Sequence, residues 1–569
     1  MIKYRMLQFL KRAKRIATAC ATLAAIFGHL PAYATAGPPG LTATTFPGIS
    51  PFGIGSDHEN GASIRALSKW TPQMEAIGIH QLRYCNPKEF SYLAGHQIVS
   101  GGLLYGIPPG DTQDAPGTLP VHNLRAWSNY VTRTVTQMHG RIKYWEVWNE
   151  PPNGTGRHQT AADYARILIS AYRAAKKVDP NCKIGMAAKS VDINYLQQVI
   201  AAGGKNHFDY ITLHPYEVLA NAITNNEDSV YMHIIPTVRK MLRAVDPSRA
   251  GVPIWFTEVG YNAHPDPAIQ ARALVQAYTM GIAEGATCIN WFEGMDGDSG
   301  PMGLLTRKGN RRPAYTAMAQ LIRYLGQHPV YLGWVPLSAH NNGFVFQGAR
   351  YTVLSAWAQN RAASRLSFDS TVEIVHPLTG HVTRATSCRL TQSPILIIGV
   401  PGGLVKLAIA DKFKQFPWNG NFTHARTVSV SLGKAIIQKG LHLVAARALI
   451  KQTAAYGGSA RSGNIPGGIT FEVDPNFLSY TREPIEITAL VRRAAPSQPA
   501  AIVLHYESPA SWGWADKNAG ACNIPAGGGW HTVKWKMTDD QFVSCWAYNF
   551  NITSGPYFIK KVTVTKLAG

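Results

Sequence analysis

Two glutamates occupy similar places in the sequence, each at the end of an apolar run. Glu150 closes "YWEVWNE", and Glu258 lies near the end of "VPIWFTEVG". Such runs predict β-strands, and an ionised carboxylate is costly to bury there unless polar groups stand beside it. Two carboxylates that face one another across a cleft suit glycoside hydrolysis, in which one protonates the leaving oxygen while the other attacks the anomeric carbon.

Further polar and aromatic side chains stand at the ends of other predicted strands. They could donate hydrogen bonds, orient a carboxylate or stack on a sugar: Arg83, Asn149, His214, Tyr216 and Trp291. A single residue of this kind is usually a solvated turn residue, so the inference of a site depends on the joint pattern. Glu146 lies inside its strand and is expected to be a buried supporting carboxylate rather than a catalyst.

Strand-like and helix-like runs alternate between about residues 45 and 327. Candidate strands such as "HQLRYCN", "IKYWEVWNE" and "FDYITLHPY" are followed by stretches with helical spacing, for example "NLRAWSNYVTRTVTQMHG". Eight such units in roughly 280 residues predict a (β/α)₈ TIM barrel, an α/β fold in which the carboxyl ends of all strands meet at one mouth. The fold would therefore bring Glu150 and Glu258 together.

Four segments are predicted along the chain. They are a signal peptide at 1–36, the catalytic barrel at 37–327, a small β-sandwich at 328–400 and an all-β jelly-roll-like domain at 401–569. The last segment could bind carbohydrate, and Trp512 and Trp514 in a Gly/Ser-rich loop are its best surface aromatics. Because every proposed catalytic group precedes Phe292, we expect removal of residues 401–569 to leave the chemistry on a small substrate intact.

The motifs resemble those of a known superfamily. "WNEP" and "TEVG" look like the acid/base and nucleophile signatures of glycoside hydrolase clan A, and "LHPY", Trp291 and "GLLTRKGNRRPAY" fit the same group. Within the clan, "EVWNEP" with a trailing β-sandwich is most similar to family 39, which includes β-xylosidases and bacterial exopolysaccharide endo-glycosidases; family 5 is the runner-up. The resemblance covers about residues 45–400. The extra proline in "WNEPPNG", which places Asn153 one position late, and the "TEVGY" variant bear on the substrate more than on the mechanism.

The resemblance implies a role for each carboxylate. Glu150 would be the general acid/base, Glu258 the nucleophile, and Asn149 would hydrogen-bond the sugar 2-hydroxyl. We expect the charge of Glu258, with partial desolvation, to raise the pKa of Glu150 so that it stays protonated. Retaining enzymes hold the two carboxyl groups about 5–5.5 Å apart, against roughly 6.5–9.5 Å in inverting ones. The short distance and net retention are expected here.

The remaining candidates would serve this pair. Arg83 and Tyr216 are expected to donate to Glu258 and keep it ionised, and His214 to orient the sugar or the carboxylates. Trp291 is interpreted as a sugar platform, with simple packing at the barrel rim as the alternative.

Two other classes of function stay open. A catalytically silent carbohydrate-binding or scaffolding protein on a degenerate barrel is one, although the presence of both glutamates with Asn149 and His214 argues against it. A polysaccharide lyase would need a Tyr/His/Arg constellation without the paired glutamates. Metal-dependent hydrolysis has no support, because neither H-E-x-x-H nor a phosphate-binding Gly-rich loop occurs. No metal and no cofactor are expected.

The first 36 residues predict export. Six basic residues precede the apolar stretch "IATACATLAAIFG", and "AYATA" offers cleavage at Ala34 or Ala36. Cys20 raises a lipoprotein alternative, which Ala17 in place of the usual leucine disfavours. No later segment is long and apolar enough to span a bilayer. We expect an extracytoplasmic protein, either periplasmic or secreted.

Six cysteines follow the predicted signal peptide, without C-x-x-C metal spacing. Cys522 and Cys545 are the expected disulfide pair, because both lie in one small domain. Cys85 and Cys288 fall in strand-like runs and are expected to be buried thiols.

The formal net charge is +22, of which the predicted signal peptide contributes six positive charges. Attraction to an anionic polymer and an adaptation of solubility are both open interpretations. The basic residues are scattered and no nucleic-acid motif occurs, which argues against nucleic acid as a partner. The predicted partner is a polysaccharide or oligosaccharide, either a bacterial exopolysaccharide or a plant cell-wall glycan. The sequence specifies neither the sugar, the linkage, endo or exo action, nor the oligomeric state.

Overall fold

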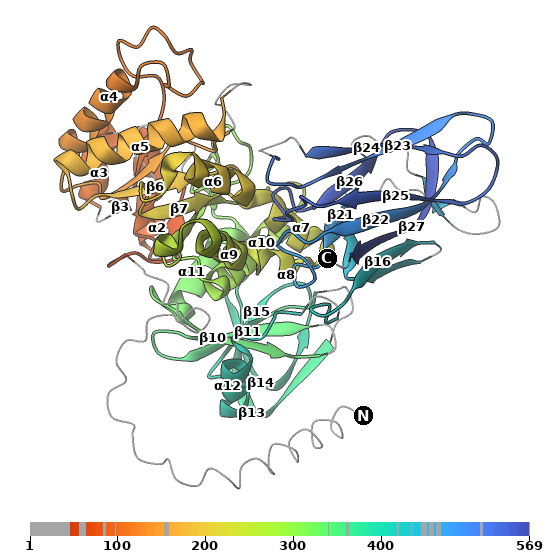
Figure 1. The fold of residues 1–569 in the computed structure, drawn as a ribbon. Coiled ribbons are helices and arrows are strands. Elements are labelled where there is room, and N and C mark those ends of the chain that lie inside the picture. The colour runs from red at the N-terminus through yellow and green to blue at the C-terminus, as the bar shows by residue number, and fades with distance from the viewer. Residues whose placement is uncertain are drawn as a thin grey trace, which may run out of the picture.

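The computed structural model describes residues 46–567 with gaps (Figure 1). The described ranges are 46–55, 64–83, 87–96, 98–152, 159–338, 341–359, 364–417, 420–433, 435–444, 452–453, 460–462, 468–511 and 516–567. The predicted signal peptide, Cys20, Cys85, Asn153, Trp512 and Trp514 lie outside these ranges, so the predictions made for them stay predictions.

Parallel strands form a closed barrel. In chain order they are β1 (Phe52–Ile54), β2 (Gln81–Leu82), β3 (Val99–Ser100), β4 (Gly102–Leu104), β5 (Tyr144–Val147), β6 (Lys183–Ala187), β7 (Tyr210–Leu213), β8 (Ile254–Val259) and β9 (Cys288–Trp291). The sheet order is β3-β2-β1-β9-β8-β7-β6-β5-β4. Because only Gly101 separates β3 from β4, these two act as one strand that closes the sheet on itself. The predicted (β/α)₈ barrel is confirmed.

Gly101 is required at this closure. A Cβ atom there would lie 2.1 Å from the carbonyl oxygen of Arg83, far inside van der Waals contact. The glycine lets the chain after β2 approach the β3–β4 strand closely. The amide of Gly101 donates a hydrogen bond to the carbonyl oxygen of Leu82 at 3.0 Å. The amide of Arg83 donates to the carbonyl oxygen of Ile54, also at 3.0 Å. The backbone of Arg83 is therefore fixed at the barrel mouth.

Helices cover the outside of the barrel (Figure 1). They are α2 (Ile64–Glu75), α3 (Pro87–Ala94), α4 (Leu124–Gln137), α5 (Ala161–Val178), α6 (Ile193–Val199), α7 (Tyr216–Asn225), α8 (Asp228–Tyr231), α9 (Ile234–Val245), α10 (Pro267–Glu284) and α11 (Pro313–Leu325). Sequence signals set their ends: Thr160 and Asp163 form a capping box at the start of α5. Among the described residues, no helix combines the length and the apolar content that crossing a bilayer would require.

Aromatic side chains close the amino-terminal end of the barrel. Tyr144 and Tyr210 are the first residues of β5 and β7, and Trp255 is the second of β8. Their rings pack with Phe46, and the ring centres of Tyr210 and Trp255 lie 4.5 Å apart. This end is therefore filled, and the carboxyl ends of the strands form the open mouth.

A six-stranded antiparallel sheet follows. Its strands are β10 (Val330–Pro336), β11 (Asn342–Gln347), β12 (Thr352–Ala356), β13 (Ser364–His376), β14 (His381–Leu390) and β15 (Ile395–Ile398), in the order β10-β11-β12-β15-β13-β14. One face packs on the barrel, where the hydroxyl of Thr279 on α10 lies 3.0 Å from that of Ser355. On the other face, Val335 and Val345 pack with Ala408 of helix α12 (Gly402–Asp411).

The helix α12 lies where only strands were expected, directly after Pro401. Leu404, Val405 and Ala408 recur at helical spacing, and all three pack against the sheet. The prediction of an all-β segment at 401–569 included no helix here, because periodicity alone separates a helix from a strand poorly over ten residues.

The third domain consists of two antiparallel sheets that share a core. The first sheet contains β16 (Thr427–Leu432), β17 (Ile436–Lys439), β19 (Gln452–Thr453), β20 (Ala460–Ser462), β22 (Ile485–Arg493), β25 (His531–Met537) and β27 (Tyr557–Lys566). The second sheet contains β18 (Leu441–Leu443), β21 (Ile469–Val473), β23 (Ala500–Tyr506), β24 (Lys517–Ile524) and β26 (Phe550–Thr553). Ile487 and Val564 of the first sheet and Phe471 and Ile552 of the second are fully buried in this core. The prediction of an all-β domain of jelly-roll type is confirmed.

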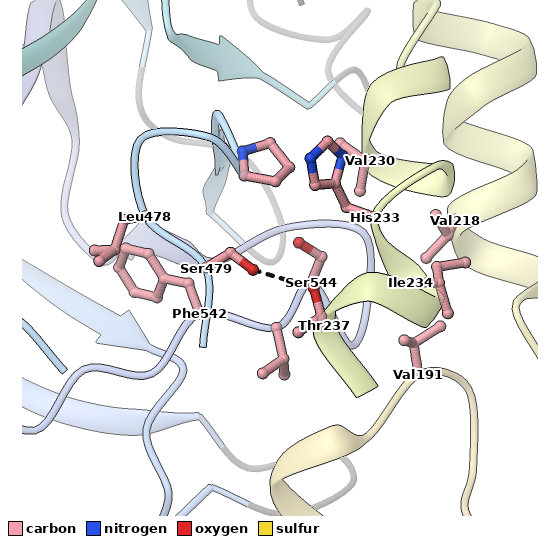
Figure 2. A pocket seen from close by; sticks show the side chains of 12 residues that line it. Val191, Val218, Val230, His233, Ile234, Thr237, Leu478, Ser479, Phe542 and Ser544 are labelled. Atoms are coloured by element: carbon pink, nitrogen blue, oxygen red, sulfur yellow. Dashed lines mark hydrogen bonds between the residues drawn. The ribbon is translucent and has the colours of Figure 1, made fainter. Parts of the chain in front are cut away.

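This third domain packs against helices of the barrel (Figure 1). On α6, the amide nitrogen Nε2 of Gln198 donates to the carbonyl oxygens of Pro509 and Ser511 at 2.6 and 3.1 Å. The hydroxyls of Thr237 on α9 and Ser479 lie 3.1 Å apart beside a cavity of about 10 Å³, lined from both domains (Figure 2). The interface between the third domain and the barrel therefore combines hydrogen bonds with apolar contacts.

The cysteine thiols of the described residues are all free: Cys182, Cys288, Cys388, Cys522 and Cys545. The predicted Cys522–Cys545 disulfide is wrong. Cys522 lies on β24 with its Sγ 3.8 Å from the carbonyl oxygen of Lys534, whereas Cys545 is buried where the third domain meets the barrel. Cys288 is buried, as expected.

Candidate active site

Glu150 follows β5 on a tight turn. Trp148 and Glu150 have φ values of 68° and 50°. Non-glycine residues in this region cost roughly 1–3 kcal/mol each, so neighbouring contacts must hold the turn. The amide of Trp148 donates to the carbonyl of Leu104, and the carbonyl of Pro151 accepts from the amide of Lys189, both at 2.9 Å. The Glu150 side chain ends at the mouth, with 20% of its surface exposed.

Glu258 lies on β8, three strands from β5 in the barrel. Its carboxylate accepts hydrogen bonds from the hydroxyl of Tyr216 at 2.9 Å and from the guanidinium of Arg83. Two residues later Gly260 is required, because a Cβ atom there would lie 2.3 Å from the carbonyl oxygen of Phe292. The two donors balance the charge of Glu258 and fix its direction.

Arg83 links the two halves of the site. Its guanidinium donates to both carboxylate oxygens of the buried Glu146, at 3.0 and 3.3 Å, and this pairing orients it. The same group reaches Glu258 and donates to Oδ1 of Asn149 at 2.8 Å. This hydrogen bond orients the side-chain amide of Asn149, whose NH₂ group is the donor that it can offer to a ligand. Arg83 thus occupies the position expected for it, beside Glu258.

His214 follows β7 and is 1% exposed. Its Nδ1 lies 2.7 Å from Oε1 of Glu150 and 3.7 Å from Oε2 of Glu258, and its Nε2 lies 3.1 Å from the hydroxyl of Thr257. The amide of His214 donates to the carbonyl of Ser190 at 3.1 Å. The imidazole is therefore held between both carboxylates, as expected of a residue that orients them.

The electrostatics of this pair differ from the expectation. Burial acts to raise the pKa of Glu150, but the hydrogen bond and charge of His214, then the charges of Lys189 and Arg83, outweigh it and lower the pKa to about 2. Burial acts to lower the pKa of His214, yet the charge of Glu258 and the bond to Glu150 raise it against the opposing Arg83. The predicted raised pKa of Glu150 is therefore wrong: its pKa is lowered and that of His214 is raised, because the hydrogen bond between them favours the charged form of both groups.

Carboxylate oxygens of Glu150 and Glu258 and a ring nitrogen of His214 all lie within 4.8 Å of one another. In the described part of the chain, this is the one group of such side chains spaced closely enough to hold a metal ion. The guanidinium of Arg83 is bonded to Glu258 and puts a positive charge at the same place, which disfavours a cation there. The arrangement suits acid–base and nucleophilic chemistry better than metal ligation.

Trp291 does not have the surface that a sugar platform needs. It is the last residue of β9, but its side chain is fully buried in the barrel core. Trp291 therefore packs in the barrel core, which is the alternative to the sugar-platform interpretation. The neighbouring acids of the last loop are also structural: Glu293 is buried and accepts from the amide of Gly297, and Asp296 binds Arg312 through both oxygens at 2.6 Å.

Tyr105 is an exposed aromatic at the mouth that the sequence interpretation missed. It directly follows β4, with 44% of its surface exposed, and its ring centre lies 4.4 Å from that of Trp148. The sequence carries a sign of this position, because Tyr105 directly follows the short apolar run "GGLL". The apolar character continues past Tyr105 through "YGIPP", so the sequence alone predicts a strand that ends after this residue.

Comparisons with known proteins agree with the fold. No protein-family model matches the chain, and no curated protein is significantly similar to it. A family 39 glycoside hydrolase from Bacteroides cellulosilyticus WH2 shares 17% identity at a TM-score of 0.50, over 61% of this chain and 80% of that one. A GH30 endoxylanase from Clostridium papyrosolvens C71 shares 13% identity at a TM-score of 0.45, over 62% and 97% of the two chains. A β-glucuronidase from Bacteroides uniformis shares 12% at 0.36, over 91% and 66%. The chain therefore resembles the family 39 glycoside hydrolase in its fold.

Proposed function

We propose that this chain is a retaining β-glycoside hydrolase that acts on a polysaccharide. The observation that carries the proposal is the pair of carboxylates at the barrel mouth, Glu150 and Glu258, with oxygens within 4.8 Å. An oxygen–oxygen separation of at most 4.8 Å is compatible with the retaining spacing of about 5–5.5 Å between carboxyl groups and is shorter than the roughly 6.5–9.5 Å of inverting enzymes. The partners differ: His214 binds Glu150, whereas Arg83 and Tyr216 bind Glu258. Such asymmetry suits one group for proton transfer and the other for attack.

In the first step, an oxygen of the Glu258 carboxylate attacks the anomeric carbon. The bond from that carbon to the glycosidic oxygen breaks, and the leaving oxygen takes a proton from Glu150. Arg83 and Tyr216 hold the attacking carboxylate in place; burial and the charge of Glu258 raise the pKa of Tyr216, which keeps its proton and can donate. The products are a glycosyl ester on Glu258 and a free alcohol.

The proton for this step belongs to the Glu150–His214 pair. The lowered pKa of Glu150 and the raised pKa of His214 favour the form in which His214 carries this proton, 2.7 Å from Oε1 of Glu150. Transfer across this hydrogen bond gives a neutral carboxylic acid and a neutral imidazole without changing the total charge. A bound glycosidic oxygen favours that form, because it accepts a hydrogen bond from the protonated carboxyl and none from the carboxylate.

In the second step, Glu150 takes a proton from a water that attacks the anomeric carbon. The ester bond to Glu258 breaks, and the two successive inversions give net retention. The side-chain NH₂ of Asn149 would donate to the hydroxyl next to the reacting carbon, a contact that strengthens in the transition state.

A polymeric substrate and an extracytoplasmic location are part of the proposal. The mouth is open at Glu150, and the exposed Tyr105 offers an aromatic surface beyond the reacting groups. The predicted signal peptide supports action outside the cytoplasm, where bacterial exopolysaccharides and plant cell-wall glycans are encountered.

A matched set of glutamate variants tests the function. Glu258→Gln and Glu150→Gln should lose turnover of aryl β-glycosides and polysaccharides, while Glu486→Gln on β22 of the third domain should retain it. Proton NMR should show the β-anomer first, and a 2-fluoro glycoside should label Glu258 in the peptide map. Wild-type-like turnover by a folded Glu258→Gln protein, or an initial α-anomer from a β-linked substrate, would reject the mechanism.

A further inference from the structure

A loop of the third domain, Val543–Ala547, has a fixed shape. The amides of Val543, Ser544 and Cys545 donate to the carboxylate of Glu507 at 2.8, 3.0 and 2.7 Å. Glu507 is buried, and Ser544 and Ala547 have φ values of 59° and 60°. Successive amides gathered on one carboxylate hold such a turn against its strain. Trp546 is therefore presented in a defined direction.

This loop lies against the barrel loop that follows β6. The hydroxyl of Ser190 in this barrel loop donates to the carbonyl oxygen of Cys545 at 2.6 Å. From the neighbouring helix α7, Nδ2 of Asn221 donates to the carbonyl oxygen of Ala547 at 3.4 Å. Nζ of Lys189 lies 5.0 Å from the ring centre of Trp546, a cation–π contact. Lys189 and Trp546 are both partly exposed.

The loop after β6 borders the acid/base group on two sides. β6 lies between β5, which precedes Glu150, and β7, which precedes His214. The amide of Lys189 donates to the carbonyl of Pro151, directly after Glu150, and the carbonyl of Ser190 accepts from the amide of His214. The Lys189–Trp546 pair is thus placed on the side where Glu150 protonates the leaving oxygen.

We infer that Lys189 and Trp546 form a subsite for an acidic sugar on the leaving-group side of the cleft. The inference rests on the proposed glycosidase function and adds a substrate class, a polysaccharide with a carboxylate-bearing sugar next to the cleaved bond. The ammonium group of Lys189 would donate a charge-assisted hydrogen bond to that carboxylate, and the indole supplies apolar surface to the sugar ring. The formal net charge of +22, of which +16 stays after removal of the six positive charges of the predicted signal peptide, favours the approach of an anionic polymer.

A competing role for Lys189 is to balance the carboxylates of this protein alone. Its charge acts on Glu150 and on Glu217, whose carboxylate lies 2.8 Å from the hydroxyl of Ser190. A purely internal role would make the loss of Lys189 equally harmful for acidic and neutral substrates. If Lys189 belongs to a subsite for an acidic sugar, its loss should reduce activity on acidic substrates much more than on neutral ones.

The experiment compares an acidic polysaccharide with its carboxyl-reduced form, in which each uronate has become a neutral hexose. kcat/KM is measured for the full-length wild type, Lys189→Gln, Trp546→Ala and, as a matched control, Lys205→Gln at an exposed position. We expect Lys189→Gln to lose roughly ten- to a hundredfold on the acidic polymer and much less on the reduced one. Trp546→Ala should lose activity on both, and Lys205→Gln on neither.

Product analysis gives an independent readout. A sugar in this subsite becomes the new non-reducing end of the released fragment, so that end should carry the carboxylate. A neutral sugar there, an equal loss on both polymers for Lys189→Gln, or cleavage restricted to neutral polymers would overturn the inference and leave hydrolysis standing. If folded wild type cleaves neither an aryl β-glycoside nor any polymer, the proposed function itself is rejected.

Discussion

Nδ1 of His214 lies 2.7 Å from Oε1 of Glu150, and the other ring nitrogen lies 3.1 Å from the hydroxyl of Thr257. The imidazole is buried and cannot turn to solvent. The titrations of His214 and Glu150 are therefore coupled, and in the proposed mechanism the catalytic acid is the pair rather than the glutamate alone. The pH profile of kcat/KM should therefore report the proton shared by His214 and Glu150, rather than the pKa of Glu150 alone.

The basic limb of kcat/KM should follow loss of the proton shared by the pair. Because the pKa of His214 is raised above 6.5, activity should persist past that pH and fall as the pH rises through the raised value. In His214→Gln the limb should report Glu150 alone and move to lower pH by at least about one unit. Profiles on one aryl glycoside measure this, and an unmoved limb would contradict the coupling.

The same pair should contribute to stability within a definite pH window. Glu150, whose pKa falls from 4.5 to about 2, contributes above 4.5 and loses its contribution as the pH drops toward 2. His214, whose pKa is raised, contributes below 6.5 and loses its contribution as the pH rises through the raised value. The melting-temperature deficit of His214→Gln should thus be largest between about pH 4.5 and 6.5. A deficit independent of pH would mean that the histidine acts through packing.

Arg83 should not tolerate the conservative replacement by lysine. Its planar guanidinium binds both oxygens of Glu146 while reaching Glu258, and an ammonium group lacks this fork. Arg83→Lys should lower kcat by roughly 10²-fold or more, as for loss of one preorganised donor. Arg311→Lys is the control at an exposed position, where the guanidinium donates to Gln73 and lies over the ring of Tyr315 without contacting either glutamate of the proposed site. Near-normal kcat in Arg83→Lys would show that the fork is dispensable.

Tyr105 should affect binding more than chemistry. If a sugar on this ring contributes as much as an aromatic pair does, about 0.5–1.5 kcal/mol, Tyr105→Ala should raise KM for an oligosaccharide roughly two- to tenfold with kcat nearly unchanged. Tyr105→Phe should behave as wild type, since the ring is kept. An equal fall in kcat for both variants would instead point to a role of the hydroxyl.

The barrel and the core of the site were predictable because they depend on topology. Parallel strands bring their carboxyl ends to one mouth, so residues after separate strands, such as Glu150 and Glu258, must meet. Arg83 and Tyr216 followed from the same rule, and both donate to Glu258. No side-chain detail was needed for these inferences.

What could not be predicted depends on side-chain direction and long-range contact. Trp291 and Tyr105 both stand at strand ends, yet one ring turns into the core and the other to solvent. The pKa of Glu150 depends on a 2.7 Å contact with His214, which spacing along the chain cannot reveal. The contact between Ser190 and Cys545 joins residues 355 positions apart, so the sequence offered no sign of it.

The last prediction replaces the expectation that residues 401–569 are dispensable. The third domain buries His442 against Glu227 of the barrel, with Nδ1 2.7 Å from Oε1 and both side chains about 2% exposed. It also bonds Cys545 to Ser190, whose backbone holds His214. Loss of these contacts should loosen the acid/base group itself.

A chain ending after α12, at residue 417, should therefore melt at lower temperature and lose at least about tenfold in kcat/KM, even on an aryl glycoside with no polymer to retain. Full-length Ser190→Ala should show a smaller loss with a smaller drop in melting temperature, since only the contacts of one hydroxyl, with Cys545 and Glu217, are removed. Ser367→Ala, exposed on β13, serves as the control that changes neither. A truncated protein that folds and turns over the aryl glycoside at the wild-type rate would restore the original expectation and confine the third domain to polymer binding.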